Sequence, residues 1–186
     1  MSTSRRVSLR FMLFVGLVVV GVLAAKWKFE AYERAFHLSF VPDALGVTVM
    51  TYSSEESSGF GPGANESGIR VYPLPEFAVV NARSGLFYFE HMPQNPQDSD
   101  RGWRGTYRGW RETPVVVDEQ NWPTQGSKPK ALDYICRYGV CAEVDPALIE
   151  EVDAIINSPG SYYAYGRIGV IIVSPSMRMV VYLFNG

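Results

Sequence analysis

The hydrophobic pattern begins with an uncharged, mostly aliphatic run over residues 11–25, which Lys26-Trp27-Lys28 closes. About 20 apolar residues are needed to cross a hydrocarbon core of ~30 Å, and with Trp27 at the interface the segment 11–29 approaches that length. We therefore expect a transmembrane anchor over 11–29. A cleaved secretory signal is the alternative, because Val22-Leu23-Ala24 offers small residues at about the position of a cleavage site.

Basic residues in front of this run predict its orientation. Three arginines precede it without any acidic residue, namely Arg5, Arg6 and Arg10, and basic residues remain on the cytoplasmic side during insertion. The predicted organisation is a cytoplasmic segment (1–10), a bilayer segment (11–29), a juxtamembrane segment (30–44) and an extracytoplasmic domain (45–186). This organisation is that of a single-pass protein of the bacterial inner (cytoplasmic) membrane with its N-terminus inside. Cleavage would instead release the domain into the periplasm.

The same basic segment is similar to a twin-arginine export signal. Leu9 agrees with that pattern, whereas Ser8 stands at its aromatic position and Arg10 replaces a lysine. An ordinary basic n-region is the alternative, so both export routes stay open. The resemblance favours a bacterial protein.

Helical spacing of apolar residues recurs in four places. It predicts a helix over 28–40 that Pro42 stops, one over 76–84 with Pro75 at its first position, and one over 130–138 stopped by Gly139. The strongest helix starts at the N-cap Asp145. Its apolar stripe consists of Leu148, Val152, Ile155 and Ile156.

Alternating or β-branched runs predict five strands, over 45–52, 69–74, 162–165, 168–173 and 179–184. The last three, joined by short turns, form an antiparallel meander, and residues 170–173 are apolar on both faces and therefore central. Residues 53–68 and 93–128 are predicted to be connections, and 86–89 fit a strand or a helix.

The fold class is α+β: an N-terminal membrane-anchor helix, then one small domain whose antiparallel sheet is covered on one face by the Pro75 and Asp145 helices.

Charge limits the possible binding partners, and the cysteines indicate the redox compartment. Beyond residue 28 the chain carries twelve basic and nineteen acidic residues, a net charge of about −7, which argues against nucleic-acid binding. Cys136 and Cys141 suit a local disulfide across a turn in an oxidising compartment. We expect no metal site, because His37 and His91 lack any paired ligand spacing, and no cofactor.

A doubled tetrapeptide is the most distinctive internal motif: Arg101-Gly102-Trp103-Arg104 recurs as Arg108-Gly109-Trp110-Arg111, with Tyr107 between the two copies. Its glycines favour a loop over a helix. Guanidinium groups bind phosphate and carboxylate bidentately, and tryptophan and tyrosine rings stack on ligands. The motif therefore predicts a site for an anionic ligand or a protein partner. The alternative is that the arginines pair with nearby acidic residues while the tryptophans pin the loop to the core.

We assign no catalytic residues, although Glu90-His91 is the one place where acid–base chemistry could arise. The favoured hypothesis is a membrane-anchored, non-enzymatic binding or accessory module of the envelope that uses the arginine- and tryptophan-rich loop. One alternative is an envelope hydrolase or transferase with His91 in a cleft. The other is a purely structural envelope protein.

Overall fold

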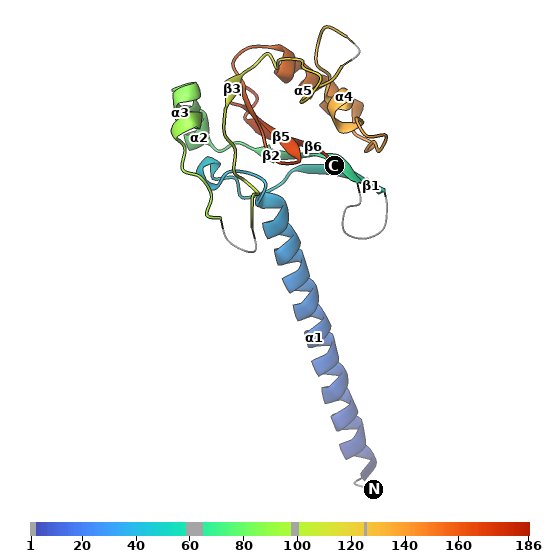
Figure 1. Ribbon diagram of the computed structural model, residues 1–186. Coiled ribbons are helices and arrows are strands. Elements are labelled where there is room, and N and C mark those ends of the chain that lie inside the picture. The colour runs from blue at the N-terminus through green and yellow to red at the C-terminus, as the bar shows by residue number, and fades with distance from the viewer. Residues whose placement is uncertain (1–2, 59–64, 98–100, 125) are drawn as a thin grey trace. The chain divides into compact units, whose positions relative to one another are not determined.

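The computed structural model describes residues 3–58, 65–97, 101–124 and 126–186, with the backbone alone for 3–11 and 13. It divides into two compact units, Met1–His37 and Leu38–Gly186. The first unit lies within α1 (Thr3–Leu38), a continuous helix that covers the predicted helix over 28–40 as far as residue 38 (Figure 1). In the described part of the chain, no helix combines the length and apolarity that a membrane span needs.

A six-stranded antiparallel sheet organises the second unit, in the order β1-β2-β6-β5-β4-β3. The α+β class is therefore confirmed. The strands are β1 (Tyr52–Ser58), β2 (Asn65–Pro73), β3 (Arg111–Glu112), β4 (Tyr162–Tyr165), β5 (Gly169–Ser174) and β6 (Met179–Asn185). The helices are η1 (Asp43–Leu45), α2 (Glu76–Ala82), α3 (Leu86–His91), α4 (Ala131–Ile135) and α5 (Pro146–Asn157).

The C-terminal half matches the sequence prediction closely. The meander of β4, β5 and β6 lies where the alternating pattern placed it, and every residue of β5 is buried, as expected of a central strand. The Asp145 side chain accepts a hydrogen bond from the Ala147 N–H at 2.9 Å and so caps α5. The buried stripe of α5 includes Ile149 where Leu148 was expected.

The N-terminal strands differ from the prediction. The predicted strand over 45–52 is wrong: η1 ends at Leu45, and Val49 is half exposed. A strand instead forms over Tyr52–Ser58, inside the predicted loop over 53–68, of which residues 59–64 lie outside the described residues. This strand pairs with β2 from Tyr52↔Val71 to Ser58↔Asn65 and forms an edge of the sheet. An edge strand does not need an apolar face. The serines and glutamates of β1 therefore lack the alternation of apolar and polar residues by which a strand is predicted.

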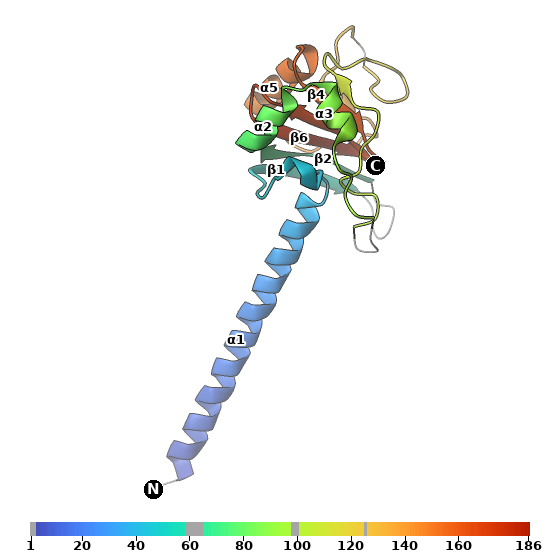
Figure 2. The same ribbon diagram turned by 90° about the vertical axis from the view of Figure 1, so that its left-hand side faces the viewer.

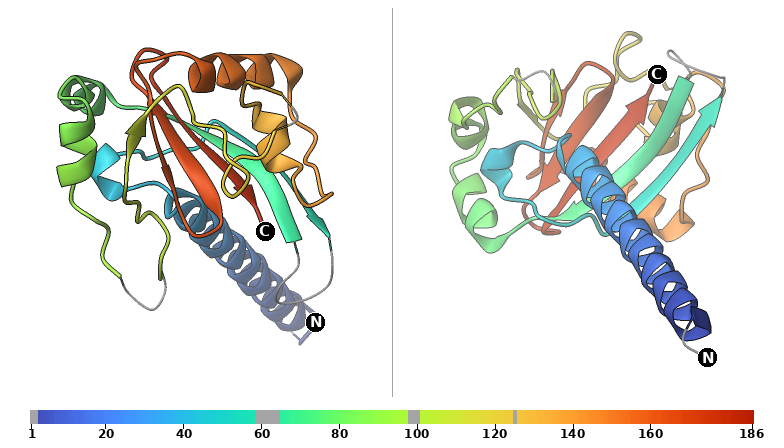
Figure 3. Two further views of the ribbon diagram at one scale, coloured as in Figure 1. Left: turned by 45° about the horizontal axis from the view of Figure 1, so that its top comes forward. Right: turned by 90° about the horizontal axis from the view of Figure 1, so that it is seen from below.

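The two faces of the sheet are covered differently. On one face, α4 and α5 close the main core over β2, β4, β5 and β6, where the ring of the fully buried Trp122 lies 4.8 Å from that of Tyr134 in a tilted arrangement (Figure 3). The Pro75 helix, α2, was expected beside α5 on this face, but it packs against α3 at one end of the sheet (Figure 2). Its buried side is only Ala78 and Ala82, which is too small to cover a sheet.

Candidate functional site

The doubled tetrapeptide lies in an irregular segment that leads into β3. Residues 101–105 form turns and 106–110 are irregular, as the glycine content predicts, and Gly102 and Gly105 have φ angles of 57° and 71°, in the left-handed region that glycine tolerates best. Arg111 belongs to β3, where it pairs with Tyr163 of β4. The seven predicted binding residues therefore belong to one loop and the strand that follows it.

The first half of this loop holds the lead-in segment, which we define as residues 39–46 at the start of the second unit. The Arg101 guanidinium donates two hydrogen bonds of 2.7 Å to the Asp43 carboxylate, and Arg104 Nε donates one of 2.7 Å to the Ser39 hydroxyl. Asn95, which is buried, accepts from the Asp43 N–H at 2.7 Å and donates to the Val41 carbonyl at 3.3 Å. These side chains form a clasp around the lead-in segment.

The ring of Phe40 lies at the centre of this arrangement. It stacks on Tyr182 of β6 at 5.0 Å and meets Trp103 edge to face at 6.0 Å. The buried Arg70 guanidinium lies between Phe40 and Phe184, 4.8 and 4.5 Å from their ring centroids, and donates to Glu55 at 2.7 Å. Cation–π contact and the ion pair together offset the cost of burying this charge.

The second half of the loop splits into buried and exposed residues. The Tyr107 hydroxyl donates to the Phe40 carbonyl at 2.8 Å, and burial raises the pKa of that hydroxyl well above its usual value. Trp110 is buried 4.8 Å from the ring of Phe89. The side chains of Arg108 and Arg111 are exposed and form no hydrogen bond or ion pair within the described residues. Four residues of the motif thus make contacts inside the domain, namely Arg101, Arg104, Tyr107 and Trp110. Arg108 and Arg111 stay available at the surface.

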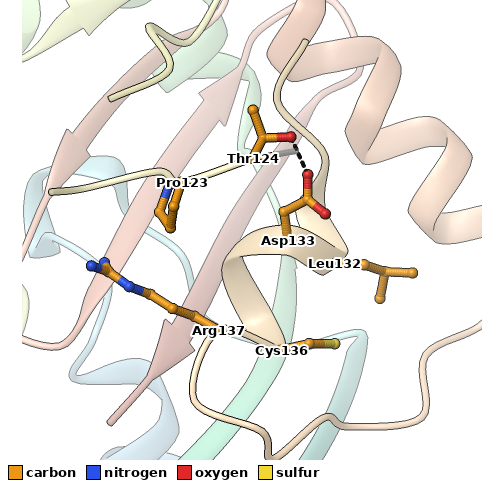
Figure 4. Close-up of a pocket in the computed structure, with 6 residues that line it drawn as sticks. All are labelled: Pro123, Thr124, Leu132, Asp133, Cys136 and Arg137. Atoms are coloured by element: carbon orange, nitrogen blue, oxygen red, sulfur yellow. Dashed lines mark hydrogen bonds between the residues drawn. The ribbon is translucent and has the colours of Figure 1, made fainter. Parts of the chain in front are cut away.

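Cys136 and Cys141 form the expected disulfide, with their Cα atoms 4.4 Å apart. Cys136 lines a cavity of about 470 Å³ at the end of α4, where Asp133 accepts a hydrogen bond from the Thr124 hydroxyl. Figure 4 shows Arg137 extending away from this carboxylate. Asp133, the acidic group among the described residues that line this cavity, is therefore already bonded within the protein.

His91 lies at the end of α3 and is exposed. Its Nδ1 is 2.8 Å from the Phe87 carbonyl, and its ring stacks on Phe87 at 4.3 Å. Within the described residues, no hydrogen bond or ion pair joins His91 to a carboxylate, which is the partner that a catalytic histidine needs. No group of three metal-ligating side chains occurs among those residues either.

The corner formed by α2 and α3 exposes large apolar side chains. Phe77, Val80 and Phe87 keep 50%, 46% and 67% of their surface accessible. Phe87 also lines a mostly apolar cavity of about 200 Å³ between the end of α2 and α3. We call this region the α2–α3 surface. Monomeric proteins rarely leave apolar side chains grouped in this way unless they bind something.

Sequence reasoning missed Arg70, Asn95 and the α2–α3 surface. The partners of Arg70 and Asn95 lie on distant segments, so no local motif marks them. The exposed phenylalanines resembled the apolar side of a short helix, and only the fold shows which of them remain uncovered. Comparisons with protein-family models, with curated proteins and with solved structures gave no match to this chain.

Proposed function

We propose that this chain is a membrane-anchored accessory protein of the bacterial envelope whose folded domain binds a protein partner and catalyses no reaction. The observation that carries the binding role is the α2–α3 surface, where Phe77, Val80 and Phe87 are exposed and Phe87 lines a small apolar cavity. Protein interfaces are built around aromatic anchors and the pockets that receive them. A cavity of about 200 Å³ is suited to one apolar side chain of a partner.

The charges around this surface favour a protein over a bilayer as its occupant. Glu76 forms an ion pair with Arg178, while Arg83 and Glu90 are exposed and of opposite sign. Because these charges balance, the surface lacks the basic excess that attracts anionic lipid headgroups. A balanced polar rim around apolar anchors is the usual composition of a protein–protein interface.

The membrane role rests on the N-terminal sequence. Three arginines, an uncharged run over 11–25 and the closing Lys26-Trp27-Lys28 support an anchor whose N-terminus stays in the cytoplasm. In this proposal the second unit faces the oxidising side of the membrane, where the disulfide between Cys136 and Cys141 is stable.

The anchor predicts that the full chain stays in the membrane pellet after a carbonate wash at high pH. Replacing Val18 and Val20 with aspartate should release it, because each charge at a helix centre costs about 2.5–3.5 kcal/mol of insertion free energy. The matched control is aspartate at Val116 and Val49, which are exposed in the domain. A soluble periplasmic product that lacks the first 24 residues, identified by mass spectrometry, would contradict the anchor.

The α2–α3 surface predicts a protein contact at position 87. A photo-crosslinking amino acid placed there in living cells should give one discrete protein adduct, and the same group at Val116 should not. The protein in the adduct, identified and purified, should then bind the full chain in detergent. Val80→Glu should weaken that binding about tenfold, as expected for an interface anchor, and Val116→Glu should leave it unchanged.

Three results would overturn this assignment. Adducts to lipid alone would indicate a membrane-binding surface, and adducts to a second copy of the chain would indicate self-association. Equal adducts from positions 87 and 116 would show that exposure alone governs the reaction. Because Val80 and Val116 are both exposed, neither glutamate should unfold the domain, and circular dichroism of the two variants checks that both are folded.

A further inference from the structure

A polar cavity of about 330 Å³ lies between the end of α4, the turn that joins β4 to β5, and the end of β6. The Asn185 side chain donates to the Tyr134 carbonyl and so holds the end of β6 against α4 (Figure 1). The residues that line the cavity and matter here are Asn121, Arg137, Tyr138, Tyr165 and Arg167. Its volume is at the lower end of the range for small-molecule sites.

Two arginines line this cavity, and neither has a carboxylate partner among the described residues. Arg137 donates to the backbone carbonyls of Gln120 and Glu119 at 2.8 and 3.4 Å, which fixes the side chain but leaves its charge unneutralised. Arg167 is exposed in the β4–β5 turn and makes no hydrogen bond or ion pair within the described residues. A guanidinium group carries five N–H donors, so both arginines keep donors for a ligand.

Tyr165 also lines the cavity. Its hydroxyl is buried and has no hydrogen-bond partner among the described residues. Burial raises the pKa of this hydroxyl above its usual value, an effect that Arg111 partly opposes, so it is protonated at neutral pH. A buried hydroxyl without a partner costs about 1–3 kcal/mol.

The charge around the cavity is positive. Arg111, from the doubled tetrapeptide, is close enough to act on Tyr165, as is Asp118. The Asn121 N–H donates to Asp118 at 2.6 Å and lowers the pKa of that carboxyl, which therefore stays ionised. The guanidinium groups of Arg111, Arg137 and Arg167 thus outnumber the Asp118 carboxylate, in a domain that is acidic overall.

We propose that this cavity binds the oxyanion group of a small organic molecule, a phosphate or a carboxylate, with Arg137 and Arg167 as the cationic ligands. Forked guanidinium donors suit both oxyanions. The cavity is larger than a single oxyanion needs, and the exposed ring of Tyr138 supplies an apolar wall for the rest of the molecule. This site does not depend on the α2–α3 surface.

The test is a titration of the full chain in nonionic detergent with inorganic phosphate and, separately, with succinate, followed by NMR. The amide signals of Gly166 and Gly169, which line the cavity, should shift saturably with a dissociation constant on the order of 1 mM. Arg167→Gln should weaken binding about tenfold, or about 1.4 kcal/mol. The matched control is Arg83→Gln, which removes the same charge from an exposed residue after α2 and should change nothing.

The two probes separate the possible sources of the oxyanion. Saturation by phosphate alone assigns a phosphorylated ligand, and saturation by succinate assigns a carboxylate. The site does not exist if neither probe saturates, or if Arg167→Gln leaves both dissociation constants unchanged. Because Arg167 makes no contact that holds the described structure together, a loss of binding in this variant cannot be assigned to unfolding, and the dispersed amide spectrum of the variant verifies this.

Discussion

Removal of residues 183–186 should leave a chain that does not fold. Leu183 and Phe184 are 0% and 2% exposed, and burying two such side chains contributes about 3–6 kcal/mol. The deletion also shortens β6, which pairs with β2 on one side and β5 on the other, and it takes away one of the two rings that enclose Arg70. Because domains are stable by only about 5–15 kcal/mol, this loss is comparable to the total.

Far-UV circular dichroism and urea unfolding of the full chain in detergent measure this effect. The control is removal of Gly186 alone, which is exposed and buries no side chain, although its backbone bonds Glu66 of β2. The shorter deletion should keep the unfolding midpoint within a few tenths molar of urea, whereas the longer one should show no cooperative transition. A truncated chain that unfolds at the same urea concentration as the intact chain would contradict the central position of β6.

Alanine at position 105 should destabilise the domain by about 3 kcal/mol, whereas alanine at position 102 should cost about 1 kcal/mol. Both glycines have positive φ angles, so both substitutions carry the strain of a left-handed backbone. They differ in surroundings: a Cβ at Gly102 meets nothing within 4 Å, but one at Gly105 meets the Asn95 side chain and lies 2.7 Å from the Ser39 carbonyl oxygen. The difference of about 2 kcal/mol therefore measures how closely the loop packs at Gly105 against Asn95 and Ser39 of the clasp.

Thermal unfolding of the two single variants tests this comparison. Gly105→Ala should lower the melting temperature several times more than Gly102→Ala does, and it should also expose Trp103 to collisional quenching of its fluorescence. Equal effects of the two substitutions would mean that the loop does not press on the lead-in segment. The comparison needs no assumption about function, since it concerns only how the loop is packed.

The C-terminal half of this fold could be predicted from the sequence because its signals are local. In α5, the N-cap and the apolar stripe occur within twelve residues, and the three strands of the meander are joined by turns of a few residues. Burial, periodicity and turn chemistry all agree in these segments, which is the condition under which sequence patterns are reliable.

The strands of the N-terminal half could not be predicted, because the pattern of apolar and polar side chains does not determine where they form. The spacing of Leu45, Val47 and Val49 suggested a strand, yet Leu45 is the only one of the three that is fully buried. The serines and glutamates of β1 form a strand because β2 offers them backbone partners, and an edge position tolerates their polarity. Pairing partners, and not side-chain pattern, decide such a segment.

The sequence predicted which residue types make up the candidate site, but not their bonding partners. The doubled tetrapeptide marked a cluster of arginines and aromatic rings, but the bonds of Arg101 to Asp43 and of Arg104 to Ser39 span 58 and 65 residues. No local pattern contains such distant partners. The same holds for the polar cavity, where α4, the β4–β5 turn and the end of β6 meet only in the folded chain.

The clasp also has a mechanical consequence for the chain. The first strand begins at Tyr52, so a pulling force applied at Leu38 is resisted first by the side chains that hold the lead-in segment, before any β-ladder is loaded. Rupture of these contacts would free residues 39–50 while the sheet stays intact, since Thr51 is bonded to Val71 of β2. Twelve extended residues reach about 40 Å. The chain between Leu38 and the sheet would thus lengthen under load when the clasp contacts break. It would shorten again when the load is removed and the contacts re-form.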